Sequence, residues 1–303
     1  MERWPHTGTG LAVIGHPIGH SLSPQMHAAA LAELARGDPR FAKWRYFPFD
    51  VAPERLAEAL DLMREHGFRG INLTVPHKVL AVDRVSSLEP AAREAGAVNT
   101  LLRDGPGWRG FNTDGYGLAA GLGEDLGVEL RGASVVLLGA GGAARGAAAE
   151  CLRAGCASLW IVNRTRSHLD MLMAQIAPLC GAAEVRGMTP DRIEAGLRHG
   201  AIVINATSAG LRADDPAPVD LAAFPGVAAV YDMIYNPPRT RLLAQAAALG
   251  VRQANGLGML VHQGAKALEI WSGIPASRTA PAMRAAATKA LGYASPTGTD
   301  LGP

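Results

Sequence analysis

Four short polar segments within residues 1–115 carry side chains that could do acid–base chemistry. Each lies at the end of a predicted strand or just beyond it, except that Asn99-Thr100 lies within the predicted strand 97–102. Open α/β sheets bind ligands beyond the carboxyl ends of their strands. Together they supply one ammonium group, on Lys78, one carboxylate, on Asp114, and several neutral hydrogen-bonding groups. A small polyhydroxylated acid that exchanges a proton at one oxygen would need this set. The segments are Ser21-Leu22-Ser23-Pro24, Asn72-Leu73-Thr74-Val75-Pro76-His77-Lys78, Asn99-Thr100 and Asn112-Thr113-Asp114-Gly115.

The first segment offers two hydroxyl groups beside a predicted helix start. Ser21 and Ser23 could hold a carboxylate at the positive end of that helix without a formal counter-charge. Ser23 also fits a helix N-cap ahead of Pro24, and Asn, Asp and Gly favour turns on backbone grounds alone. The residue types by themselves leave both interpretations open.

A glycine-rich turn starts the second half of the chain. Gly139-Ala140-Gly141-Gly142-Ala143-Ala144 follows an apolar strand directly and opens an alanine-rich helix. This is the G-x-G-x-x-A form of the dinucleotide fingerprint in its strand–turn–helix context. The glycines permit a tight turn and let the backbone amides at the helix start approach a pyrophosphate.

The end of the next strand selects the nucleotide. An NAD enzyme needs an acidic residue there to accept from the ribose 2′-hydroxyl. This chain has Asn163-Arg164-Thr165-Arg166 instead, with two guanidinium groups and no acid. Arginine binds a 2′-phosphate through forked, charged hydrogen bonds, so NADP is the predicted cofactor. The alternative is a solvated basic turn.

The elements that position these segments alternate between short apolar runs and helical patterns. This order predicts an α/β fold with mostly parallel sheets covered by helices. The predicted strands are 11–14, 44–49, 70–73, 97–102, 134–138, 159–162, 201–204, 227–231 and a short one near 251. The predicted helices are 24–34, 53–66, one ending at 154, 167–177, 238–249, 258–271 and 276–291.

Two domains follow from this pattern, with a boundary in the glycine-rich stretch 114–132. Residues 1–114 and 257–303 are predicted to form a substrate-binding and catalytic domain. Residues 115–256 are predicted to form a Rossmann-like NADP-binding domain. The C-terminal helices would then pack back on the first domain.

Composition narrows the partners. The formal net charge is only +2 and no run of like charges appears, so nucleic acid and anionic membranes are not expected. No apolar stretch approaches the roughly 18 residues of a membrane span. The first residues show no apolar signal region, and we expect a cytoplasmic protein that is a monomer or homodimer and binds a small molecule.

Metal and disulfide chemistry are not expected. Cys151, Cys156 and Cys180 form no C-x-x-C pair and are typical of reduced, apolar core residues. The histidines His16, His20 and His27 have no ligating acid or cysteine beside them and are interpreted as loop and helix-cap residues. His77 is expected to point outward from its loop.

The ordered motifs as a set resemble the shikimate dehydrogenase family, from about Leu11 to Gly273. The likeness rests on S-L-S-P-Q-M-H at 21–27, G-I-N-L-T-V-P-H-K at 70–78, A-V-N-T-L at 97–101 and G-F-N-T-D-G at 110–115. Further motifs are the 139–145 turn, N-R-T at 163–165, N-A-T-S-A-G at 205–210, Y-D-M-I-Y at 231–235 and G-L-G-M-L-V-H-Q at 256–263.

The resemblance implies reversible hydride transfer between NADPH and the C3 carbonyl of 3-dehydroshikimate, in chorismate biosynthesis. Lys78 and Asp114 would be the acid–base pair. The substrate carboxylate would be held by Ser21, Ser23, Thr74 and Tyr235, and the ring hydroxyls by Asn99, Lys78, Asp114 and Gln263. The cofactor would meet Gly139, Ala140, Gly141, Gly142, Ala143, Asn163, Arg164, Thr165, Arg166, Thr207, Ser208, Met233, Gly256 and Met259.

Three departures from the family pattern are visible. Ala28 stands where Asn commonly follows the Met-His pair, His168 stands where a second basic residue is usual, and Asn255 replaces an acid. The sequence leaves open whether Lys78 carries the proton or acts as an electrostatic clamp. The alternatives are a quinate/shikimate dehydrogenase, which would favour NAD, and a dehydrogenase-like binding protein without catalysis.

Overall fold

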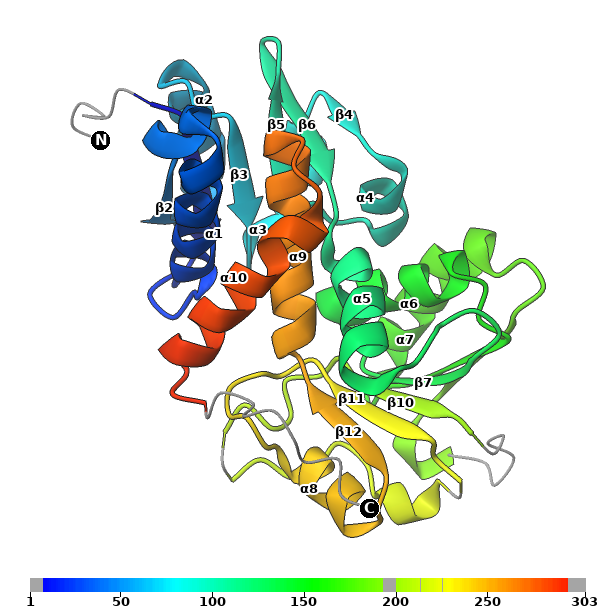
Figure 1. Cartoon of the computed structure of the whole chain (residues 1–303). Coiled ribbons are helices and arrows are strands. Elements are labelled where there is room, and N and C mark those ends of the chain that lie inside the picture. The colour runs from blue at the N-terminus through cyan, green and yellow to red at the C-terminus, as the bar shows by residue number, and fades with distance from the viewer. Residues whose placement is uncertain (1–7, 193–199, 213, 225, 294–303) are drawn as a thin grey trace.

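The structure is a computed structural model that describes residues 8–192, 200–212, 214–224 and 226–293. It has two lobes, each built on a six-stranded sheet (Figure 1). Residues 1–7 and 294–303, which the sequence assigns to the first domain, lie outside the described residues.

The sheet of the first lobe is mixed. Its strand order is β2-β1-β3-β5-β6-β4. β1 pairs in parallel with β2 and β3, whereas β5 is antiparallel to both β3 and β6. The strands are β1 Gly10–Gly15, β2 Arg45–Asp50, β3 Gly70–Leu73, β4 Ser87–Leu88, β5 Thr100–Asp104 and β6 Gly107–Phe111.

The sheet of the second lobe is entirely parallel. Its order is β12-β11-β10-β7-β8-β9, so the chain reverses direction across the sheet between β7 and β10. Ligands bind at such switch points in open α/β sheets. The strands are β7 Ser134–Leu138, β8 Ser158–Val162, β9 Glu184–Met188, β10 Ile202–Asn205, β11 Ala229–Asp232 and β12 Arg252–Asn255.

Helices cover both sheets. The α-helices are α1 Ser23–Gly37, α2 Leu56–Glu65, α3 His77–Leu80, α4 Pro90–Ala95, α5 Asp114–Leu126, α6 Gly142–Arg153, α7 Arg166–Ile176, α8 Arg241–Ala248, α9 Leu257–Ser272 and α10 Ala276–Ala290. Short 3₁₀ turns lie at Pro39–Lys43, Pro53–Arg55, Val82–Arg84, Ala177–Leu179, Pro190–Arg192 and Leu221–Ala223.

Each central strand divides its side chains between two cores, because successive residues of a strand face opposite sides. In β1, Leu11 and Val13 pack beneath α1, α9 and α10, while Ala12 and Ile14 pack beneath α2. The second sheet does the same, with α5, α6 and α7 on one face and α8 on the other. The predicted packing of the C-terminal helices on the first lobe is confirmed, since α9 and α10 share a core with α1.

Most of the glycine-rich stretch 114–132 is the helix α5, which the sequence pattern did not predict. Gly117 and Gly121 of α5 face the backbone of Met259 in α9, and an added Cβ would lie 2.6 Å from its carbonyl oxygen or 2.8 Å from its nitrogen. Glycine lowers helix propensity, but here it lets two helices approach closely. α5 and α9 are the two connections between the lobes (Figure 1).

The structure also contains elements that the sequence pattern did not predict. They include α3, α4, β4, β6 and β9. The strand predicted at 97–102 is β5, which begins at Thr100. The helix starts at Asp114 and Leu257 coincide with the predicted domain boundaries. The division into a catalytic and a cofactor domain stays a prediction.

Candidate active site

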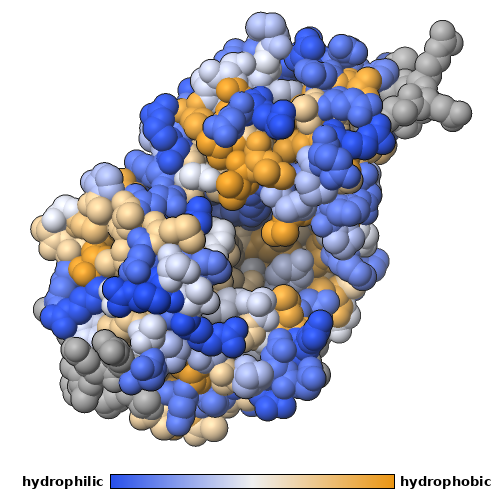
Figure 2. All heavy atoms as spheres, turned by 180° about the vertical axis from the view of Figure 1, so that it is seen from behind, coloured by the Kyte–Doolittle hydropathy of each residue, from blue (hydrophilic) through white to orange (hydrophobic). Residues whose placement is uncertain are grey.

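A cavity of about 370 Å³ lies between the lobes, and the surface is hollowed there (Figure 2). Its walls come from the loops after β1 and β3, from the first turns of α5 and α6, from the segment after β11 and from α9. Among the residues predicted from the sequence, it brings together Ser21, Ser23, Thr74, Lys78, Asp114, Ala143, Met233, Tyr235, Gly256, Met259 and Gln263.

Lys78 and Asp114 meet in this cavity. The Lys78 ammonium donates to a carboxylate oxygen of Asp114 at 2.7 Å, and the two side chains are 30% and 15% exposed. Asp114 opens α5, where the positive end of the helix stabilises its charge. Lys78 lies on the short helix α3, directly after the turn that follows β3. A solvent-accessible ammonium beside a carboxylate can give a proton to an oxygen and receive it back.

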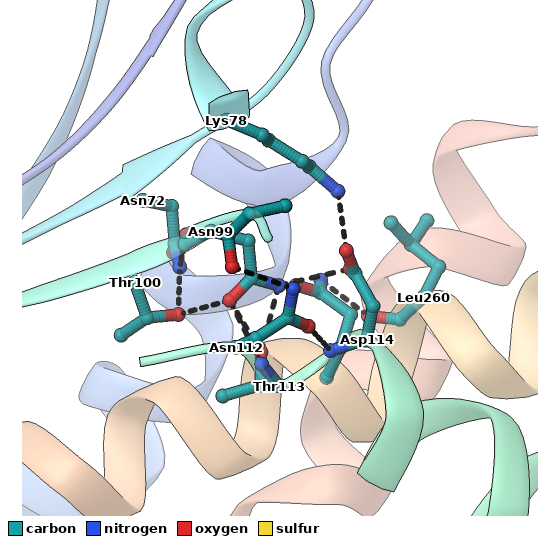
Figure 3. Close-up of polar contacts among 10 residues, drawn as sticks. Asn72, Lys78, Asn99, Thr100, Asn112, Thr113, Asp114 and Leu260 are labelled. Atoms are coloured by element: carbon teal, nitrogen blue, oxygen red, sulfur yellow. Dashed lines mark hydrogen bonds and ion pairs between the residues drawn. The ribbon is translucent and has the colours of Figure 1, made fainter. Parts of the chain in front are cut away.

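Buried amides fix the orientation of Asp114 (Figure 3). The Asn99 amide donates to the second Asp114 carboxylate oxygen at 2.9 Å and to the Thr113 hydroxyl at 3.0 Å. The Asn112 side-chain oxygen accepts from the Asp114 backbone nitrogen at 3.0 Å. Asn99 does not line the cavity and is buried, so its predicted contact with a substrate hydroxyl stays a prediction.

Hydroxyl groups also line the cavity. Ser21 and Ser23 lie where the loop after β1 enters α1, and the Ser21 hydroxyl accepts from the Ser23 backbone nitrogen at 3.3 Å. The helix begins at Ser23 and Pro24, and its N-cap Leu22 has no capping side chain, which corrects the interpretation of Ser23 as the N-cap. Burial raises the pKa of Tyr235, so its hydroxyl stays protonated and available as a donor.

Two histidines differ from their interpretation. His77 is buried and its ring hydrogen-bonds the Val51 carbonyl at 2.8 Å, so it anchors the turn that carries Lys78 and does not point outward. His27 is neither a loop nor a cap residue, because it lies inside α1, stacked on Tyr46 with ring centroids 4.0 Å apart. Within the described part of the chain, no group of three or more His, Cys, Asp or Glu is placed to hold a metal ion.

The glycine turn has the shape that a pyrophosphate requires. Gly139 has a φ of 111°, a conformation that favours glycine, and its amide donates to the Val162 carbonyl at 2.8 Å. An added Cβ at Gly141 or Gly142 would meet nothing within 4 Å. Gly141 caps α6 without a side-chain hydrogen bond, so the first amides of this 12-residue helix are free for a ligand.

The basic turn after β8 lies at the surface, with Arg164, Thr165 and Arg166 exposed. Arg166 donates to Asp170 at 2.9 Å, one turn further along α7. Arg164 has no ion pair within the described residues. The Asn163 side chain donates to the Thr165 carbonyl at 2.9 Å and fixes the turn. The chain therefore presents one free guanidinium for a 2′-phosphate and one that is already bound.

The remaining cofactor residues lie on the loops after β10, β11 and β12, except for Met259, which lies in the first turn of α9. The Thr207 hydroxyl donates to the Asn205 side-chain oxygen at 2.7 Å, and Ser208 beside it is exposed. Gly256 lies against Met233, because an added Cβ would be 2.1 Å from the Met233 carbonyl oxygen. Met233, Gly256 and Met259 line the cavity.

Sequence reasoning missed several residues around the cavity. His20 and Leu260 line it, and Asn72 does so while hydrogen-bonding deeper residues. Asn72 gives a signal in the sequence, since it is a polar residue within the buried strand β3. The hydroxyl of Tyr46, which donates to Asn72 at 2.8 Å, gives no comparable signal.

The fold and the site together define an NADP-dependent dehydrogenase. A parallel sheet carries a glycine turn and a basic strand end, and the lobe facing it carries an ammonium–carboxylate pair. Among the described residues, no helix is long and apolar enough to cross a membrane.

Comparison with known proteins identifies the family. Three family models match in order along the chain: the shikimate dehydrogenase substrate binding domain at 13–101, shikimate/quinate 5-dehydrogenase at 122–213 and the shikimate 5′-dehydrogenase C-terminal domain at 256–288. A shikimate dehydrogenase (NADP(+)) of Geobacter metallireducens is 41% identical over 266 residues, which cover 87% of this chain and 91% of that protein. The chain belongs to the shikimate dehydrogenase family, as its motifs predict.

Solved structures agree with this assignment. The shikimate 5-dehydrogenase of Thermus thermophilus, in complex with NADP(H) and shikimate, is 35% identical with a TM-score of 0.78, over 92% of this chain and 99% of that one. A 5-ketofructose reductase of a Gluconobacter species is 33% identical with a TM-score of 0.79, over 92% and 98%. The same fold therefore occurs in a reductase named for 5-ketofructose and in a dehydrogenase named for shikimate.

Proposed function

We propose that this chain catalyses the reversible, NADPH-dependent reduction of 3-dehydroshikimate to shikimate. The observation that carries the proposal is the 2.7 Å contact between Lys78 and Asp114 inside a cavity that both lobes line. A binding protein without catalysis has no need for this pair at the point where the substrate lobe faces the cofactor lobe.

The reaction needs a hydride and a proton. When bound, NADPH would supply the hydride to the C3 carbonyl carbon. As the carbon–oxygen π bond opens, the oxygen would take a proton from the Lys78 ammonium. The positive charge beside the oxygen also stabilises the alkoxide character that develops in the transition state. Asp114 holds the ammonium in place, and Lys78 regains its proton from solvent. Oxidation of shikimate runs through the same steps in reverse.

The proposed substrate contacts follow the chemistry of the groups around the cavity. Hydroxyl groups hold the carboxylate, and the acid–base pair with neighbouring amides holds the ring hydroxyls. We assign Ser21, Ser23, Thr74 and Tyr235 to the carboxylate, and Asn99, Gln263, Lys78 and Asp114 to the hydroxyls. A carboxylate matches the four hydroxyl donors, whereas 5-ketofructose, which has no carboxylate, would leave them without an anionic partner.

The proposed NADP contacts follow the carboxyl edge of the second sheet. Gly139–Ala143 receive the pyrophosphate, Asn163–Arg166 receive the adenosine 2′-phosphate, and the loops after β10 to β12, with the first turn of α9, surround the nicotinamide. The last group comprises Thr207, Ser208, Met233, Gly256 and Met259. A cytoplasmic location and a monomeric or homodimeric state stay predictions.

Steady-state kinetics test this function. We expect the purified chain to oxidise shikimate with NADP⁺ at a kcat/KM at least about tenfold above its kcat/KM for shikimate with NAD⁺. The value should also be at least about tenfold above its kcat/KM for quinate with either cofactor. NADPH oxidation with 5-ketofructose should be slower than with 3-dehydroshikimate. Faster turnover of quinate with NAD⁺ would make the chain a quinate/shikimate dehydrogenase. An absence of turnover would favour a binding protein.

A further inference from the structure

A series of buried, hydrogen-bonded side chains begins at Tyr46, passes through Asn72 in the cavity wall and ends at the Asp114 carboxylate. The Tyr46 hydroxyl donates to the Asn72 side-chain oxygen at 2.8 Å, and the Asn72 amide donates to the Thr100 hydroxyl at 3.0 Å. The Thr100 hydroxyl donates to the Asn99 side-chain oxygen at 2.9 Å, and the Asn99 amide donates to Asp114 at 2.9 Å. Figure 3 shows the last three of these bonds.

In this hydrogen-bonded series, every side chain donates to the next one in the direction of Asp114. A Tyr or Thr hydroxyl has one proton, and an amide oxygen can only accept. Thr100 receives from Asn72 and donates its own proton to the Asn99 oxygen. This oxygen also accepts from the Thr113 backbone N–H at 2.9 Å, so the two donors together turn the Asn99 NH₂ group toward Asp114.

The opposite orientation of Asn99 would disrupt the acid–base pair. If the amide were reversed, its oxygen would face the Asp114 carboxylate, and its NH₂ would face the Thr113 backbone N–H, which now donates to Asn99 at 2.9 Å. The four members of the series, Tyr46, Asn72, Thr100 and Asn99, are all buried. Hydrogen bonds are strong and mutually polarising in such surroundings, so an unpaired member is costly.

We propose that Thr100 and Tyr46 are positioning residues for Asp114, acting through Asn72 and Asn99. Neither side chain lines the cavity, so neither touches substrate. They set the direction of the Asn99 amide, and thereby the carboxylate oxygen that is left for Lys78 at 2.7 Å. This inference rests on the proposed function, because it concerns the alignment of that acid–base pair.

Replacement of Thr100 by Val and by Ser tests the proposal. Val keeps the shape of Thr and removes the hydroxyl, whereas Ser keeps the hydroxyl. We expect Thr100→Val to lower kcat for shikimate oxidation about five- to tenfold, which corresponds to the loss of one buried hydrogen bond, with KM changed less than about threefold. Thr100→Ser should recover kcat to within about threefold of wild type.

Two further variants keep the test decisive. Thr279 in α10 is a buried threonine whose hydroxyl donates to the Ala276 carbonyl at 3.2 Å, so Thr279→Val is a matched control that should leave kcat unchanged. Tyr46→Phe removes the first donor of the series and should lower kcat about threefold. If a thermal melt shows that Thr100→Val is not folded, Tyr46→Phe takes its place in the test.

The outcomes separate the two proposals. An inactive wild-type chain contradicts the proposed function. An active wild type with an unchanged kcat in folded Thr100→Val, or in Tyr46→Phe where that variant takes its place, overturns the positioning role. A Thr100→Val effect confined to KM, or a Thr100→Ser variant as slow as Thr100→Val, overturns it as well.

Discussion

The substrate half and the cofactor half of the site differ in how many of their polar groups are already hydrogen-bonded in the absence of ligand. In the substrate half, Lys78, Asp114 and Asn99 are bound to one another and Asp114 is held from several sides. In the cofactor half, the first amides of α6 are free and Arg164 lies exposed without an ion pair among the described residues. The substrate half is aligned in advance, which suits chemistry that depends on small displacements. The cofactor half offers unpaired donors, which suits a large polyanion.

The strongest test of the aligned half is removal of its ammonium. We expect Lys78→Ala to lower kcat by about 10³, within the range of general acid–base catalysis, and to change KM for shikimate far less. Lys266→Ala is the matched control, because Lys266 is 32% exposed and ion-paired with Glu269, yet does not line the cavity. A Lys78→Ala effect confined to KM would assign this lysine to binding alone.

A buried histidine of the first lobe should also make the fold sensitive to acid. Burial lowers the pKa of His27 to about 4, because the charged imidazole is excluded from the core, while a hydrogen bond to the Ser23 carbonyl opposes the shift. Above the unfolded value of 6.5, both states are neutral and the residue contributes nothing to pH dependence. As the pH falls from 6.5 toward the folded-state pKa of about 4, His27 binds a proton in the unfolded state but stays neutral in the native state. The free energy of unfolding should therefore decrease, by about 3 kcal/mol at pH 4.

Urea unfolding between pH 7.5 and 4 measures this sensitivity. His27→Asn keeps a donor toward Ser23 but does not titrate, so its free energy of unfolding should fall less steeply with pH than that of wild type. His66→Asn, at an exposed position, should keep the wild-type slope. Equal slopes in the wild type and His27→Asn would mean that His27 does not titrate differently on folding.

The cofactor half could be predicted from sequence more directly than the substrate half. The glycine turn and the basic strand end are local, since each consists of a few consecutive residues. The contact of Lys78 with Asp114 joins residues 36 positions apart and required the family resemblance. Tyr46 and Asn72 lie on β2 and β3, which flank β1 in the sheet, so their contact depends on the tertiary fold.

Two misinterpretations have the same cause. The helix α5 was not predicted because glycine is a poor helix former, and its reason for being there is the approach of α9. His77 was predicted to point outward as a loop residue, but its ring reaches the Val51 carbonyl in the loop after β2. Local composition predicts what a segment prefers alone, and long-range contacts overrode it at both places.

The smallest predicted effect distinguishes the two arginines of the cofactor half. Arg164→Ala should raise KM for NADP⁺ about 10- to 100-fold, as expected for charge-assisted hydrogen bonds worth about 1.5–3 kcal/mol. Arg166→Ala should raise it less than about threefold, because Arg166 must first leave Asp170, its partner at 2.9 Å. Neither variant should change KM for NAD⁺, which has no 2′-phosphate.

The partner of Arg166 offers the sharpest check. Asp170→Ala would release that guanidinium and remove a nearby negative charge, so it should lower KM for NADP⁺ while leaving KM for NAD⁺ unchanged. The same KM series at rising ionic strength should converge, since salt screens exposed charges. Equal losses in Arg164→Ala and Arg166→Ala would mean that both arginines bind the phosphate and that the pair with Asp170 opens at no cost. The free donors of this half would then include a residue that the structure shows as already bound.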